Sequence, residues 1–86
     1  MLRIGENGVV YGKFIQFLHV GKTASGKTDI FLVQNPENGS FLGEVRWHGA
    51  WRKYCFFPTV GTLFEQVCLR DISDFIEAET QKQKVK

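Results

Sequence analysis

Apolar residues near the C-terminus recur at the spacing of one helix face, and this pattern constrains the fold more than any other feature. The charged and polar residues between them, including Asp71 and Asp74, are expected on the opposite side, facing solvent. Just upstream, Thr62 and Glu65 have the spacing of a capping box. We therefore expect one amphipathic helix that fades near Thr80. Its apolar positions are Cys68, Leu69, Ile72, Phe75 and Ile76.

The chain before this helix has the composition of an antiparallel sheet. Four segments rich in β-branched and aromatic residues are separated by turns that contain glycine or proline. Residues 1–11 contain a turn that leads toward a further short strand. An apolar sheet face must be covered, and the helix is the available cover. The predicted fold is α+β: a four- to five-stranded antiparallel sheet of two hairpins, packed by one C-terminal amphipathic helix. The four main strands are expected at 12–20, 28–34, 41–48 and 51–57.

Length and charge indicate one small domain without a strongly basic body. A chain of 86 residues forms a single domain, expected over residues 1–80. The lysine-rich residues 81–86 have almost nothing to bury and are expected to be disordered. Three of the 11 basic residues lie in this tail, which leaves 8 against 9 acidic residues elsewhere. This balance argues against a dedicated nucleic-acid binder, although a local cluster at Arg46, Arg52 and Lys53 stays open.

The remaining composition predicts a cytoplasmic protein, in the host cytoplasm if a phage encodes it. The N-terminus lacks the pattern of a signal peptide, and no apolar run has the length of a membrane span. Cys55 and Cys68 are too few for a disulfide framework, so both are expected as free thiols. No spacing of histidine, cysteine or acidic residues predicts a metal site, and no catalytic constellation is visible. We therefore expect a protein that is not an enzyme and has no cofactor.

Residues 21–28 match the phosphate-binding motif G-x-x-x-x-G-K-[ST] at every fixed position. That motif functions because a helix begins at its end and directs its N-terminus at the phosphates. Here the following residues are β-branched and aromatic, and a proline comes soon after them. The sequence therefore predicts a polar hairpin loop instead of a phosphate-binding loop.

The densest mixture of aromatic and cationic residues lies between Gly43 and Pro58. Two hairpin registers fit this stretch. A three-residue connection places Trp47 opposite Trp51 and both in the core, and a two-residue connection places Trp47 opposite Arg52. A slip of one residue inverts the faces of a strand. In both registers Arg52, Tyr54 and Phe56 share one face, which is the best candidate site.

Such a surface suits an anion that carries a flat ring. Arginine binds phosphate through two parallel hydrogen bonds, and aromatic rings stack on bases. Arginine–aromatic stacking also finishes many sheet surfaces without any ligand, and a protein interface is a third interpretation. The predicted ligand-binding residues are Arg46, Trp47, His48, Arg52, Lys53, Tyr54 and Phe56.

Residues 42–58, together with Thr62, Phe64 and 68–76, resemble a family of small uncharacterised proteins from bacteriophages and bacteria. The resemblance covers about half of the chain and rests on the tryptophan–arginine–tyrosine–phenylalanine–proline hairpin and the cysteine–leucine–arginine–aspartate helix. It implies a phage setting, in which small proteins often antagonise a host system.

The leading functional expectation is a phage-type protein that binds a nucleotide or a nucleotide-derived signal and sequesters it from host defence. A pocket for such a ligand would lie between subunits of a homo-oligomer, because so short a chain rarely encloses a small molecule. The first alternative is a nucleic-acid-binding accessory protein that uses the same hairpin. The second is an inhibitor that binds a host protein.

Overall fold

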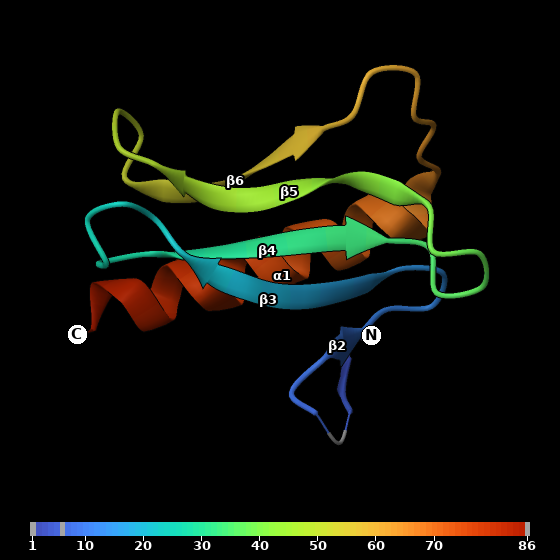
Figure 1. Cartoon of the computed structure of the whole chain (residues 1–86), viewed down its shortest axis with the longest axis horizontal. Helices are drawn as coiled ribbons and strands as arrows, with labels where there is room; N and C mark the ends of the chain where they lie inside the picture. Colours follow the sequence, from blue (N-terminus) through green and yellow to red (C-terminus); the bar gives the residue numbers. More distant parts are fainter. Residues whose placement is uncertain (1, 6, 86) are drawn as a thin grey trace.

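The computed structural model describes residues 2–5 and 7–85, and it consists of one antiparallel sheet and one helix (Figure 1). The strands are ordered in the sheet as in the sequence. The predicted α+β class with one C-terminal helix is confirmed, but the sheet has six strands where four to five were expected. The elements are β1 (Arg3–Ile4), β2 (Val10–Tyr11), β3 (Gln16–Lys22), β4 (Asp29–Gln34), β5 (Phe41–His48), β6 (Lys53–Pro58) and α1 (Gln66–Lys84).

The additional strands are the two-residue β1 and β2. They form a small hairpin in which Ile4 pairs with Val10, and Val10 also pairs with Phe17 of β3. The turn between them contains Gly8 at φ 77°, a conformation that favours glycine. Two residues are too few to show the alternation by which a strand is recognised in a sequence. This is why only four strands could be placed with residue bounds.

The segment expected to begin the first long strand forms a bend against the helix. The Gly12 N–H donates to Ile15 O at 2.8 Å, and the Lys13 N–H donates to Asp71 Oδ2 at 2.9 Å. Gly12 is required because a Cβ there would lie 2.5 Å from Asp71 Oδ2. The Asp71 side chain was expected in solvent, but it is 1% exposed. Its carboxylate therefore fixes the bend, and β3 starts only at Gln16.

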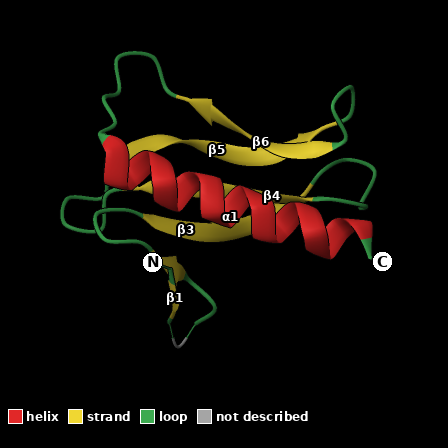
Figure 2. Ribbon diagram, turned by 180° about the vertical axis from the view of Figure 1, so that it is seen from behind, coloured by secondary structure: helices red, strands yellow, loops and turns green. Residues whose placement is uncertain are grey.

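Helix α1 covers one face of the sheet along most of its length (Figure 2). Phe75 lies at the centre of this contact. Its ring stacks on Phe17 with centroids 4.1 Å apart and meets Phe31 edge-on at 4.9 Å. Leu69 was expected in the same contact but is half exposed. The core residues are Ile15, Phe17, Phe31, Val33, Val45, Tyr54, Cys68, Ile72 and Phe75.

Both ends of the helix differ from the prediction. The N-cap is Glu65, whose side chain accepts the Cys68 N–H at 2.7 Å, whereas Thr62 donates to Thr59 O outside the helix. At the other end α1 continues past Thr80 to Lys84. Basic side chains in the last turn interact favourably with the helix dipole. Residues 81–84 are therefore helical, contrary to the expected disorder, and Lys86 lies outside the described residues.

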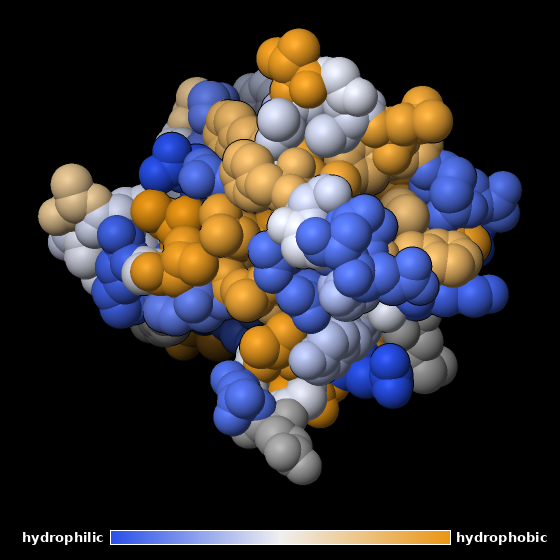
Figure 3. Space-filling view, turned by 45° about the vertical axis from the view of Figure 1, so that its right-hand side comes forward, coloured by the Kyte–Doolittle hydropathy of each residue, from blue (hydrophilic) through white to orange (hydrophobic). Residues whose placement is uncertain are grey.

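The second sheet face is not covered by the helix, and Figure 1 looks onto it. Figure 3 shows part of the surface obliquely, with apolar patches in orange beside hydrophilic side chains in blue. Phe41 and Phe57 are exposed, and Leu18 and Leu32 are half-buried. In the described part of the chain, no helix is long and apolar enough to cross a membrane.

Candidate functional site

The β5–β6 hairpin has a register that neither sequence prediction contained. Trp47 lies opposite Tyr54, and His48 lies opposite Lys53. The connection is therefore four residues, 49–52, instead of two or three. It closes with hydrogen bonds from the Arg52 N–H to the carbonyl oxygens of His48, at 2.9 Å, and Gly49, at 3.2 Å. Arg52 adopts φ 54°, a left-handed conformation that is uncommon outside glycine and hard to predict at an arginine.

This register places three of the seven predicted site residues against the helix and the core. Tyr54 is 2% exposed, and its hydroxyl accepts the Asp29 N–H at 3.0 Å. Burial raises the pKa of Tyr54 above its usual value. Trp47 meets Tyr54 edge-on at 5.5 Å, and Phe56 meets Phe64 edge-on at 5.2 Å. The prediction that Arg52, Tyr54 and Phe56 share a strand face is therefore wrong, because Arg52 lies in the turn.

The other four predicted residues lie on the uncovered face or at the hairpin tip. Arg46 projects from β5, and its Nη1 atom is 3.7 Å from Glu44 Oε1. The His48 ring meets Trp51 edge-on at 4.8 Å. Arg52 and Lys53 are exposed. The structure thus separates the predicted cations from two of the rings expected to stack beside them.

Three segments distant in sequence meet at one end of the molecule. The β3–β4 loop and the β5–β6 tip lie at the same end because Ile30 pairs with Arg46. The C-terminal part of α1 arrives there too, since the Tyr54 N–H donates to Thr80 Oγ1 at 3.1 Å. Figure 1 shows these segments together on the left. We call this region the basic end, and its residues are Lys22, Lys27, Trp51, Arg52, Lys53, Lys82 and Lys84.

Most of the cations in the basic end have no acidic partner. Lys22 lies 3.0 Å from Asp29, and Lys82 lies 2.9 Å from Glu79. Within residues 2–5 and 7–85, the remaining cations of the basic end form no ion pair. Burial acts to raise the pKa of Asp29, but hydrogen bonds from Lys22 and His19 hold it below its usual value. The unpaired cations are Lys27, Arg52, Lys53 and Lys84.

Charge is therefore segregated along the molecule. The basic end holds six cations, and the nearby carboxylates are Asp29, Glu77 and Glu79. These leave an excess of three positive charges, whereas the whole chain carries only +2. The small net charge of the whole chain therefore does not indicate the local positive surface, which the fold forms from separate segments.

Trp51 is the aromatic residue of the basic end. Its side chain is 68% exposed, although the three-residue register placed it in the core. It stands beside Arg52 and Lys53, so a ring and two cations share the hairpin tip. The adjacent residues Trp51, Arg52 and Lys53 already indicate such a surface in the sequence. Both predicted hairpin registers put Trp51 or Arg52 in a paired strand, whereas the structure has them in the turn.

The residues that match the phosphate-binding motif form the predicted hairpin loop. No helix follows Thr28, because β4 begins at Asp29. The hydroxyl of Thr28 is 2.9 Å from Thr23 Oγ1, and the Thr23 N–H donates to Thr28 O across the loop. Thr28 is buried and so cannot face an incoming metal–phosphate group. The loop contributes the side chain of Lys27 to the basic end.

Two hollows adjoin the basic end, and the described residues gather no set of metal ligands there. Among the residues that the structure describes, no group of three or more histidine, cysteine, aspartate or glutamate side chains could hold a metal ion. A groove of about 590 Å³ runs between β6 and α1, and it is lined in part by Lys53 and Lys84. A second hollow of about 300 Å³ lies near His19 and Lys82.

Comparison with known proteins finds a similarity to a small phage protein. The chain is 28% identical over 72 residues to an "Uncharacterized 9.3 kDa protein" of Acholeplasma phage L2, a match that covers 84% of this chain and 91% of that protein. No family model and no solved structure matches the chain. The chain is therefore similar in length and sequence to a small phage protein whose printed name gives no activity.

Proposed function

We propose that this is a small non-enzymatic binding protein that holds single-stranded nucleic acid at its basic end. The observation that carries the proposal is Trp51, an exposed ring that is followed in sequence by Arg52 and Lys53 and lies at the same end of the molecule as further unpaired cations. Proteins that bind single strands without sequence preference combine a positive surface for the backbone with rings on which bases stack. An extended polyanion suits this end because its cations are spread over three segments of the chain.

The first expectation, sequestration of a single nucleotide-like ligand, has weaker support. It relied on Trp47 and Tyr54 as stacking rings, and both pack against the core. A homo-oligomer that completes a pocket and an inhibitor that binds a host protein stay predictions. The similarity to a phage protein supports a phage setting for any of these functions.

The substitution Trp51→Ala tests the proposal. It removes the exposed ring but no cation, and stacking on one base contributes about 1–3 kcal/mol. We expect affinity for a fluorescein-labelled oligothymidylate of twelve nucleotides to fall by about fivefold to a hundredfold. Fluorescence anisotropy at low salt measures it, and Trp51→Phe is expected to retain part of the affinity.

Leu63→Ala is the matched control. Leu63 is 94% exposed but lies in the β6–α1 connection, at the opposite end from the basic end. This variant should bind as the parent does. Equal affinity of Trp51→Ala and the parent, or tighter binding of free ATP than of the oligonucleotide, would contradict the proposal.

A further inference from the structure

On the outer edge of β6, Phe56 is the residue whose backbone N–H and C=O both face outward without a partner among the described residues. Alternate residues of an antiparallel strand direct their backbone groups to opposite sides. The Tyr54 N–H points away from β5, toward Thr80, whereas the Thr59 N–H points to Leu42 of β5. Phe56 is two residues after Tyr54, so its backbone groups point to the same side as those of Tyr54. Its N–H and C=O therefore face outward, and no hydrogen bond from the described residues engages them.

This edge is closed on both sides of Phe56. Thr80 occupies the Tyr54 N–H, and Pro58 has no N–H to offer. Proteins commonly block exposed strand edges in such ways, because an open edge pairs with other chains. The gap leaves room for hydrogen bonds to one residue of an incoming segment, so it suits a short segment better than a long edge-to-edge pairing.

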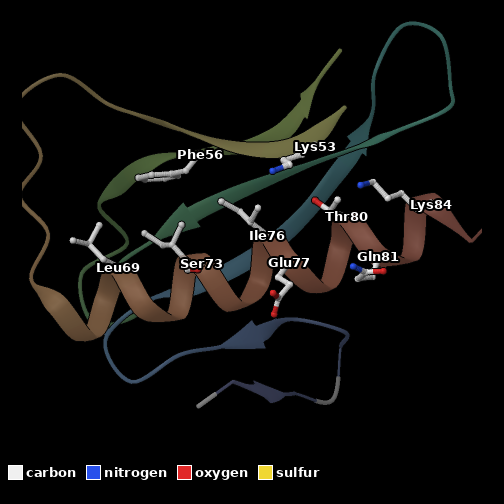
Figure 4. Close-up of a pocket in the computed structure, with 10 residues that line it drawn as sticks. Lys53, Phe56, Leu69, Ser73, Ile76, Glu77, Thr80, Gln81 and Lys84 are labelled. Carbon is white, nitrogen blue, oxygen red and sulfur yellow. The ribbon is translucent and has the colours of Figure 1, made fainter. Parts of the chain in front are cut away.

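The groove beside this gap has an apolar end and a cationic end. Figure 4 shows Phe56 above Leu69 at one end, and Lys53 with Lys84 near the other. Leu69 was expected in the core, but it is 52% exposed along this groove. Lys53 and Lys84 have no acidic partner among the residues described, although Glu77 also lines the groove. A ligand that places an apolar side chain at the first end and a negative charge at the second would therefore fit the groove.

We propose that this groove binds an extended peptide that pairs with Phe56 through one residue, which is apolar and is followed two positions later by an acidic residue. An antiparallel peptide runs from Pro58 toward Lys53, so its later residues reach the cationic end. The residue opposite Phe56 exchanges both hydrogen bonds with it and directs its side chain between Phe56 and Leu69. Beyond that residue the peptide leaves the edge, because Thr80 occupies the Tyr54 N–H, and the side chain two positions later brings its carboxylate to Lys53 and Lys84.

A second copy of the chain is a poorer occupant. Edge-to-edge pairing of two β6 strands would satisfy Phe56, but both flanking positions lack a free N–H. It would also leave the lysines of each groove without a carboxylate. Charge complementarity and the single open residue therefore favour a short acidic–apolar peptide of another protein.

A labelled heptapeptide, Ser-Thr-Ser-Thr-Leu-Thr-Glu, tests the proposal on the full chain. We expect the Phe56 amide to show the largest shift among β6 amides in a ¹⁵N correlation spectrum. Methylation of the leucine nitrogen of the peptide removes the donor to Phe56 C=O, and it should weaken binding at least tenfold. Replacing the peptide leucine by serine should have a similar effect, and replacing the glutamate by lysine should weaken binding several-fold.

Leu69→Ser is the groove variant, and Val20→Ser is its matched control. Both side chains are 52% exposed, but Val20 lies on β3, away from the groove. Leu69→Ser should weaken peptide binding about tenfold or more and leave oligonucleotide affinity unchanged. Trp51→Ala should weaken oligonucleotide binding and leave peptide affinity unchanged. Undiminished binding of the N-methylated peptide would overturn the proposal. So would the absence of peptide binding, or Phe56 shifts that depend on protein concentration alone, which would indicate self-association.

Discussion

The substitution Phe75→Ala is expected to lower the free energy of unfolding by about 3–5 kcal/mol. Phe75 is 2% exposed and joins the helix to two strands through its contacts with Phe17 and Phe31. Removing the ring leaves a cavity between rigid partners, because Phe17 lies parallel to it at 4.1 Å. Urea denaturation followed by circular dichroism measures the loss.

A domain of this size has a total stability of roughly 4–13 kcal/mol, so Phe75→Ala will unfold a protein near the lower bound. Phe75→Leu keeps most of the volume and should cost about 1–2 kcal/mol in that case. Phe41→Ala is the control, because Phe41 is 47% exposed on the other sheet face. A loss below about 1 kcal/mol for Phe75→Ala would contradict the packing of α1 described above.

The second large effect is expected for Gly43→Ala, with a loss of roughly 2–6 kcal/mol. Gly43 has φ 154°, where a side chain is strained, and it lies at the irregularity in the β4–β5 pairing. A Cβ there would lie 2.5 Å from Phe57 O and 2.9 Å from Pro58 Cα. Both are backbone atoms of β6, so the strand must move to make room.

Gly39→Ala separates strain from crowding. Gly39 also has positive φ, at 72°, but a Cβ there would meet nothing within 4 Å. It should cost only about 1 kcal/mol, through backbone strain alone. Thermal denaturation of the two variants measures the difference. Equal losses would mean that β6 does not lie against Gly43 as the structure has it.

The long elements could be predicted from sequence because their residues repeat with a clear period. The helix face containing Ile72 and Phe75 and the strands from β3 to β6 were recognised in this way. The burial of Asp71 could not be predicted, because a periodic pattern cannot show that the Lys13 N–H donates a hydrogen bond to this helix residue. The strands β1 and β2 are too short to show any period.

The candidate site was harder to predict because it depends on two non-local facts. One is the hairpin register, which depends on a left-handed conformation at Arg52 that its residue type disfavours. The other is that Lys27, Lys53 and Lys84, which are far apart in sequence, lie at one end of the molecule because of the strand order and the helix length. A count of charges along the chain could not reveal this local excess.

The salt dependence of oligonucleotide binding tests the central claim most directly. If the four unpaired cations contact phosphates, the logarithm of the binding constant should fall with the logarithm of salt concentration at a slope of about −2.8. The double variant Lys27→Ala/Arg52→Ala should reduce that slope by about 1.4, whereas Lys13→Ala/Arg70→Ala, outside the basic end, should leave it unchanged. A slope near zero, or the same slope in all three proteins, would contradict nucleic-acid binding at the basic end.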